Sequence, residues 1–250
     1  MRGALFRMDR VVFNPFSPLL LLFLFGIIVL FGLAVILFPI IFLTAIGATF
    51  TKLGFSLREA LLILLLTLAG SFINIPVRTL ESRTLPAYDR YIPVYGRLYR
   101  IPRPARRTVL AVNVGGALIP TVISLYLLYD SVIISGGYLL LGLALLGVVV
   151  VTIVTKVVAR PVPGLGIATP FFIPPLAALF SALILSLFAG GVPGAAVIIA
   201  YVSGTLGTLI GADLLNLGSI ADLGAPMASI GGAGTFDGIF LSGIIAALLA

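Results

Sequence analysis

The chain has 250 residues, of which 61% are hydrophobic and only 9% are charged. Soluble domains carry roughly 25% charged residues, and a soluble fold cannot bury this much apolar surface. We therefore expect an integral membrane protein and exclude the soluble enzyme classes. The sequence contains no Cys and no His, which excludes disulfides, thiolate nucleophiles, Ser–His hydrolases, H-E-x-x-H zinc sites and His-ligated haem. We expect neither a metal ion nor a cofactor.

Seven apolar runs predict membrane-spanning helices, since about twenty apolar residues cross a bilayer. They predict an all-α fold: a polytopic helix bundle of the cell membrane, surrounded by membrane lipids and forming a single transmembrane domain over residues 1–250. The first run contains Pro39, and its apolar character continues towards Phe50. It is interpreted as one tilted helix or as a helix followed by a re-entrant piece. The predicted spans cover residues 17–46, 57–75, 108–129, 138–158, 170–189, 194–217 and 226–250.

The positive charges predict the orientation. All Lys and Arg residues except Lys52 and Arg58 precede the first span, lie between the second and third, or close the fourth. The N-terminus is therefore predicted to be cytoplasmic, and residues 76–107 a basic cytoplasmic loop. Within it, residues 91–101 are compatible with a short strand or hairpin. The loop is interpreted as an anchor with interfacial tyrosines, or as a site for anionic lipid head groups. It supplies most of the net charge of +7, so we predict no nucleic acid partner.

Two of the eight acidic residues, Asp213 and Asp237, lie inside predicted spans. Ionisable side chains at that depth are expensive and are functional candidates by default. The spans contain no Lys or Arg at comparable depth, so each carboxyl group is expected to stay protonated or to lie in a water-filled cavity. Two carboxyl groups that share one cavity divide their titration, so that one holds the proton while the other ionises. Such a pair can activate a water molecule and protonate a leaving amine.

The glycines at positions 231, 232 and 234 are expected to keep the chain unwound before Asp237, with the helix starting near Thr235. An Asp on the sixth span, with Gly-x-Gly followed by Asp at the start of the seventh, resembles the presenilin and signal-peptide-peptidase group of intramembrane aspartyl proteases. The resemblance implies that Asp213 and Asp237 are the catalytic pair. It also implies that Gly232 and Gly234 contribute to substrate binding and that transmembrane peptides are the substrates.

The chain departs from that group at identifiable positions. Thr235 and Phe236 separate the Gly-x-Gly from the aspartate, where the group has no gap, and Ala212 stands where the group usually has Tyr. The group also has a Pro-Ala-Leu element on a later span, for which the Pro-Pro-Leu at residues 174–176 on the fifth span is a weak counterpart. The whole chain further resembles a family of prokaryotic multi-span proteins, a resemblance that implies no activity.

Two asparagines are further candidates for substrate binding. Asn216 lies three residues after Asp213 on the same helix face and is interpreted as its hydrogen-bond partner. Asn113, near two glycines and Pro120, is interpreted as a third residue lining the cavity or as part of helix packing. Residues 161–175 contain five prolines and cannot form a continuous helix, which leaves a re-entrant segment or a cytoplasmic loop.

Three functions remain open at this point. Peptide-bond hydrolysis in the membrane by the aspartate pair is favoured. A proton- or ion-coupled transporter would use the same two carboxyl groups as its binding site. A non-catalytic scaffold would keep both aspartates protonated and hydrogen-bonded across helices.

Overall fold

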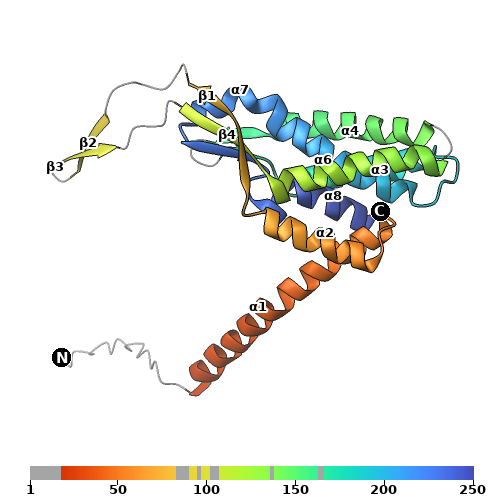
Figure 1. The fold of residues 1–250 in the computed structure, drawn as a ribbon. Coiled ribbons are helices and arrows are strands. Elements are labelled where there is room, and N and C mark those ends of the chain that lie inside the picture. Colours follow the sequence, from red (N-terminus) through yellow and green to blue (C-terminus); the bar gives the residue numbers. More distant parts are fainter. Residues whose placement is uncertain (1–17, 83–89, 95–96, 102–106, 136–137, 163–165) are drawn as a thin grey trace, which may run out of the picture. The chain divides into compact units, whose positions relative to one another are not determined.

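The computed structural model describes residues 18–82, 90–94, 97–101, 107–135, 138–162 and 166–250. Contacts divide the chain into two units, residues 1–44 and 45–250. The described part of the first unit belongs to helix α1 (Pro18–Lys52), whose last turns lie in the second unit (Figure 1). In the first unit the side chains of α1 are apolar on all sides and mostly exposed. This is the pattern of a helix that is surrounded by lipid.

Four helices of the described residues are long and apolar enough to cross a membrane. They match four of the seven predicted spans. The other three predicted spans hold shorter helices, α2 (Leu57–Gly70), α5 (Ile173–Ser186) and α8 (Gly238–Leu249). Fourteen helical residues rise about 21 Å, less than the roughly 30 Å of a hydrocarbon core. The four long helices cover Pro18–Lys52, Val114–Ile133, Leu139–Val158 and Ala195–Ile220.

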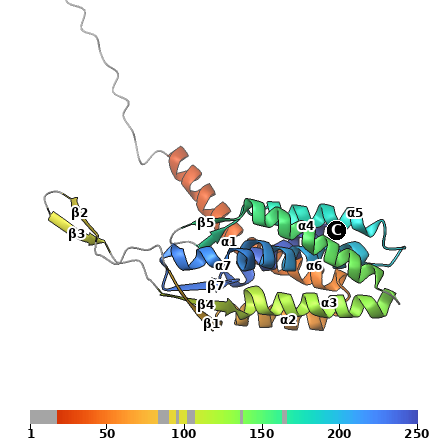
Figure 2. The ribbon, with the colours of Figure 1, turned by 90° about the horizontal axis from the view of Figure 1, so that it is seen from above.

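Helix α6 (Ala195–Thr208) is the centre of the second unit (Figure 2). Its side chains are almost all buried, because neighbouring helices cover it on several sides. Glycines allow this close packing: a Cβ on Gly207 would lie 2.6 Å from the Cβ of Val151, and one on Gly204 would lie 2.8 Å from the Ser242 carbonyl oxygen. The helices that pack against α6 are α3 (Ile119–Ser135), α4 (Leu139–Val158), α5 and α8.

The all-α prediction is wrong for three segments at the ends of predicted spans, which form a sheet instead. Strands β1 (Asn74–Glu81) and β4 (Arg107–Asn113) pair antiparallel, and β4 pairs parallel with β7 (Met227–Ile230), so the order is β1-β4-β7. A short apolar run cannot be assigned to strand or helix by periodicity alone. Pro76 and Pro226 disfavour a continuous helix through these segments. The sheet lies at one end of the helices (Figures 1 and 2).

Two hairpins complete the described secondary structure. Strands β2 (Arg90–Val94) and β3 (Arg97–Ile101) pair antiparallel, which confirms the strand or hairpin predicted for residues 91–101. Strands β5 (Arg160–Val162) and β6 (Gly166–Ala168) pair within the proline-rich stretch, which is therefore not a continuous helix, as predicted. Helix α5 begins within the last residues of this stretch, with prolines in its first turn, where a missing N–H leaves no helical bond unmade.

Candidate functional site

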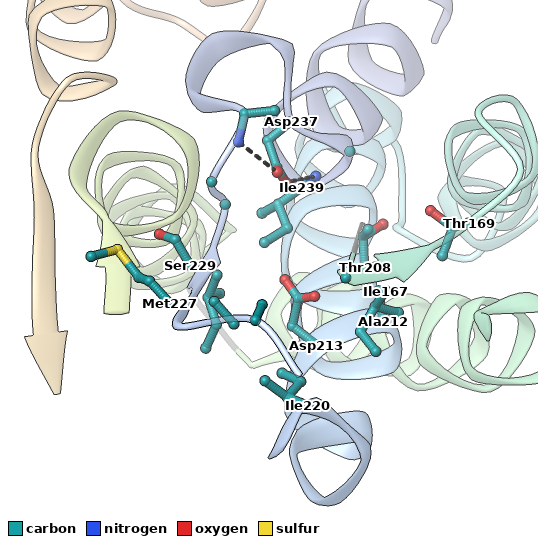
Figure 3. Close-up of a pocket in the computed structure, with 18 residues that line it drawn as sticks. Ile167, Thr169, Thr208, Ala212, Asp213, Ile220, Met227, Ser229, Asp237 and Ile239 are labelled. Carbon is teal, nitrogen blue, oxygen red and sulfur yellow. Dashed lines mark hydrogen bonds between the residues drawn. The ribbon is translucent and has the colours of Figure 1, made fainter. Parts of the chain in front are cut away.

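A cavity of about 420 Å³ lies between strand β7 of the sheet and the end of helix α6. Strand β7 and the glycine-rich turn after it form one wall, and the end of α6 with strand β6 forms the other (Figure 3). The start of α8 closes the top of the cavity in this view. The lining residues are Gly166, Ile167, Thr169, Thr208, Ala212, Asp213, Ile220, Ala225, Met227, Ala228, Ser229, Ile230, Gly231, Gly232, Ala233, Asp237, Gly238 and Ile239.

Asp213 lies where the central helix loses its α-helical geometry. Helix α6 continues into a π-helical turn (Leu209–Asp213) and then a 3₁₀ turn (Leu214–Asn216) before α7 (Leu217–Ile220). A π-helical turn re-aims the side chains at its end, and such turns are frequent at functional sites. Gly231 lies on the opposite wall of the cavity.

A lysine and an asparagine hold this break in the helix. The Asn216 side-chain amide donates to the carbonyl oxygens of Ala212 at 2.7 Å and Gly211 at 3.2 Å. The Lys156 ammonium group, on α4, donates to Asn216 Oδ1 at 2.6 Å and to the Leu215 carbonyl at 2.8 Å. Carbonyl groups that the irregular turns leave without an α-helical partner are thereby satisfied. The sequence predicted Asp213 as the hydrogen-bond partner of Asn216, and this prediction is wrong. Asn216 instead bonds to Lys156 and to the backbone. It does not line the cavity.

Asp237 is the N-cap of α8. Its Oδ1 accepts a hydrogen bond from the Ile239 N–H at 3.0 Å, and its Oδ2 accepts one from the Ala233 N–H at 3.3 Å (Figure 3). The prediction that the chain is unwound before Asp237 is confirmed: Gly231 and Gly234 have φ angles of 70° and 63°, which favour glycine. The helix begins at Gly238, slightly later than the predicted start.

The two aspartates, which are 24 positions apart in the sequence, line the same cavity and are close enough to interact electrostatically. Both carboxyl groups point into the space between the two walls, and the Ile239 side chain lies between them in the view of Figure 3. Among the lining residues they are the only ionisable side chains. Both predicted aspartates therefore line one cavity, and no basic side chain is among its described lining residues.

Of the other predicted site residues, some line the cavity and others pack in the structure around it. Gly232 lines the cavity, whereas Gly234 packs against Ser71. Asn113 does not line it: this buried side chain caps the π-helical turn Val114–Leu118, accepting from the Gly116 N–H at 2.8 Å and donating to the Ser71 carbonyl at 2.8 Å. Of the two interpretations of Asn113, the structure supports packing.

Sequence reasoning missed several groups that build the site. Strand β7 contributes Met227 to Ile230 to the wall, strand β6 contributes Ile167, and the end of α6 contributes Thr208. Lys156 is also missing from the predicted site residues, although its ammonium group hydrogen-bonds to the broken end of the helix at Leu215 and Asn216. No local pattern marks the strand residues or Lys156, because each reaches the site through a contact between distant segments.

A family model for the "Protein of unknown function (DUF1614)" matches residues 68–249. The chain belongs to the DUF1614 family. The match includes both aspartates, all three strands of the sheet and the helices around α6, so the cavity lies entirely within the DUF1614 region. No curated protein and no solved structure matches the chain.

The chemistry available to this DUF1614 site is that of a carboxyl pair. Within the described ranges no three His, Cys, Asp or Glu side chains gather to hold a metal ion. Two carboxyl groups in one cavity can hold one proton between them, so that a single site offers both a base and an acid. That combination serves hydrolysis by an activated water, and it equally serves the binding and release of a proton.

Proposed function

We propose that this DUF1614 protein is an intramembrane aspartyl protease in which Asp213 and Asp237 activate a water molecule. The observation that carries the proposal is that the two carboxyl groups line one cavity beside strand β7. The resemblance of this aspartate pair and its glycines to the presenilin and signal-peptide-peptidase group supports it. The position of the cavity at the end of long apolar helices is suited to substrates that lie in the membrane.

The surroundings of the two carboxyl groups assign their roles. Asp237 accepts two backbone N–H groups, one from Ile239 in the first turn of α8 and one from Ala233 in the turn before it, an arrangement that favours a carboxylate. Asp213 precedes the 3₁₀ turn Leu214–Asn216, and its side chain makes no capping hydrogen bond there. We therefore assign the base to Asp237 and the acid to Asp213. Asp237 takes a proton from the water as its oxygen attacks the peptide carbonyl carbon, while Asp213 gives its proton to the carbonyl oxygen.

Collapse of the resulting gem-diol completes the reaction. The C–N bond breaks, the leaving nitrogen takes up a proton, and the products are a carboxylic acid and an amine. The proton that Asp237 took from the water is available for the amine, and Asp213 recovers its own proton from the diol. One water molecule is consumed for each peptide bond, and both aspartates return to their starting states.

Strand β7 offers a means of holding the substrate. It is the edge strand of the sheet, paired on one side with β4, and all four of its residues line the cavity. A helical substrate hides its peptide groups in its own hydrogen bonds, so a protease must bind it extended. We propose that the extended segment pairs with the open edge of β7, which presents one of its peptide bonds to the aspartates.

The test is cleavage of a pooled library of synthetic transmembrane peptides by the purified protein in liposomes, read by mass spectrometry. Asp213→Asn and Asp237→Asn keep the shape of each side chain and are each expected to lower cleavage by about 10²–10⁴-fold. Asp130→Asn, on α3 and away from the cavity, is the matched control and is expected to cleave as the wild type does.

Helix content measured by circular dichroism checks that each variant is folded. The proposal is wrong if the wild type produces no fragment that the two cavity variants fail to produce. Loss of cleavage in all three variants alike would also contradict it, because that result would trace to any loss of charge rather than to the cavity.

A proton-coupled carrier is the second candidate. It is favoured by a separate observation: Thr208, which lines the cavity, and Thr205, one turn away on α6, have buried hydroxyl groups with no hydrogen-bond partner among the described residues.

A further inference from the structure

The turn that leads to Asp237 keeps its shape through its own hydrogen bonds. The N–H of Gly234 donates to the Gly231 carbonyl at 2.9 Å, and the N–H of Asp237 donates to the Gly234 carbonyl at 3.0 Å. Bonds within a turn fix its curvature, but they do not fix its distance from the opposite wall of the cavity. That distance decides where Asp237 lies relative to Asp213, so contacts from outside the turn must contribute to it.

Ser71, the C-cap of helix α2, makes such a contact. Its Oγ accepts a hydrogen bond from the Thr235 N–H at 3.1 Å and donates one to the Thr67 carbonyl at 2.7 Å. Thr235 is only 2% exposed, so its N–H would be costly to leave without a partner. A Cβ on Gly234 would lie 2.5 Å from the same Oγ. The turn before Asp237 is therefore held against the end of α2.

Asn113 joins this contact to the strand that forms the neighbouring part of the cavity wall. Its side-chain amide donates to the Ser71 carbonyl at 2.8 Å and to Asn74 Oδ1 at 3.1 Å. The Ser229 hydroxyl donates to the same oxygen of Asn74 at 2.5 Å. Ser229 lines the cavity on strand β7 (Figure 3). One buried amide group is thus linked to the turn before Asp237 on one side and to β7 on the other.

The π-helical turn Val114–Leu118 supports the same junction through glycines. A Cβ on Gly231 would lie 2.7 Å from the Ala117 backbone nitrogen, and a Cβ on Gly115 would lie 2.5 Å from the Ser71 backbone nitrogen. Backbone therefore packs directly on backbone at both places, and no flexible side chain lies between them. Small shifts at this junction are passed on to the turn that it contacts.

The two aspartates are held by separate sets of contacts. Asp213 lies at the broken end of α6, which Asn216 and Lys156 hold. Asp237 follows the turn that Ser71 holds, and the two sets have no residue in common. Loss of one set should therefore change the separation of the aspartates. A misplacement of about 1 Å can cost about 10²-fold in rate.

We propose that Ser71 and Asn113 are positioning residues, which hold Asp237 and strand β7 at the distance from Asp213 that hydrolysis requires. This inference rests on the proposed protease function. Neither Ser71 nor Asn113 lines the cavity, so both act through the segments that they hold. Loss of the Ser71 hydroxyl leaves the pairing of β7 with β4 intact, so it should lower kcat and leave KM nearly unchanged.

The experiment measures kcat and KM of the full chain in liposomes, with a transmembrane peptide that the wild type cleaves. Ser71→Ala is expected to lower kcat by about 10–100-fold at a nearly constant KM. Ser124→Ala is the matched control, with wild-type values expected. Ser124 on α3 is buried and donates to the Pro120 carbonyl, four residues earlier, at 2.9 Å. It loses the same kind of bond as Ser71 does to Thr67, but it does not line the cavity.

A second readout does not depend on cleavage. The chain has no cysteine, so Leu215→Cys and Ala233→Cys allow spin labels on the broken end of α6 and on the turn. Electron paramagnetic resonance is expected to show a changed or broader distance between the labels in Ser71→Ala and in Asn113→Leu, and no change in Ser124→Ala. Circular dichroism checks the folding of each variant, and Ser71→Ala decides the result if Asn113→Leu does not fold.

The outcomes separate this inference from the protease proposal. If the wild type cleaves and Ser71→Ala keeps its kcat, the positioning role is overturned and the protease proposal stands. A raised KM at constant kcat, or an equal loss of activity in Ser124→Ala, also overturns the positioning role. No cleavage by the wild type overturns the protease proposal and the positioning role together.

Discussion

Replacing Asn216 with Leu removes the side chain that bridges the broken end of the central helix to α4. Leu has a similar volume, so the change removes hydrogen bonds and leaves the packing nearly intact. Three bonds are lost: the two from the Asn216 amide to the Gly211 and Ala212 carbonyl groups, and the one that Asn216 Oδ1 accepts from Lys156. The site is buried, with Asn216 only 6% exposed.

The magnitude follows from these bonds. A neutral hydrogen bond contributes about 0.5–1.5 kcal/mol and a charged one about 1.5–3 kcal/mol. Polar contacts within membrane bundles average only about 0.6 kcal/mol, and Lys156 is exposed and can bind water instead. We therefore expect Asn216→Leu to lower the free energy of unfolding by about 2–3 kcal/mol, and Lys156→Met by at most about 1 kcal/mol.

The assay is reversible unfolding by a denaturing detergent, followed by circular dichroism, on the two single variants and the double variant. Direct contact predicts that the effects of Lys156→Met and Asn216→Leu are not additive. Lys52→Met is the matched control, because Lys52 also donates to one carbonyl group but does not contact Asn216. A change below about 0.5 kcal/mol for Asn216→Leu, or additive effects of the contacting pair, would refute the reasoning.

Three further predictions follow from the same geometry. Gly211→Ala would place a Cβ 2.6 Å from the Thr152 carbonyl oxygen, so we expect about 1–3 kcal/mol of destabilisation in the same unfolding assay, whereas Gly218→Ala, with open space around it, should change little. Asp237→Asn keeps the N-cap of α8 and should remain within about 0.5 kcal/mol of the wild type, while Asp237→Ala should cost about 1 kcal/mol; equal stabilities of these two variants would count against the capping role. Arg107 and Glu81 form an exposed ion pair, 2.9 Å apart, and Glu81→Gln should lower the free energy of unfolding by less than about 1 kcal/mol. A larger decrease would contradict the exposed, screened character of the pair.

The features of the site that depend on residues close together in the sequence could be predicted from the sequence. Asp213 and Asp237 are distinguished because they are the two acidic residues that lie inside predicted spans. The glycines at 231, 232 and 234 predict an unwound segment because a helix interior disfavours them. Alternation and turn residues near 91–101 predict the hairpin. Each of these signals lies within about a dozen residues, where periodicity and propensity operate.

The parts that depend on distant pairing could not be predicted. Strand β7 becomes a strand because Val109 to Val112 of β4 lie beside it, more than a hundred residues earlier in the chain. Its own four residues read equally well as the start of a helix. The bond between Lys156 and Asn216 likewise joins residues 60 positions apart. α-Helical spacing favours a contact between Asn216 and Asp213, whereas the 3₁₀ turn Leu214–Asn216 changes that spacing.

The most direct test of the central claim is a single-turnover cleavage of a transmembrane peptide in water enriched in ¹⁸O, with mass spectrometry of both the products and the protein. Attack by a water that Asp237 activates predicts one ¹⁸O atom in the new carboxyl group of the product, no label in either aspartate, and no product from Asp213→Asn. An unlabelled product with ¹⁸O in an aspartate, or equal cleavage by that variant, would contradict the account.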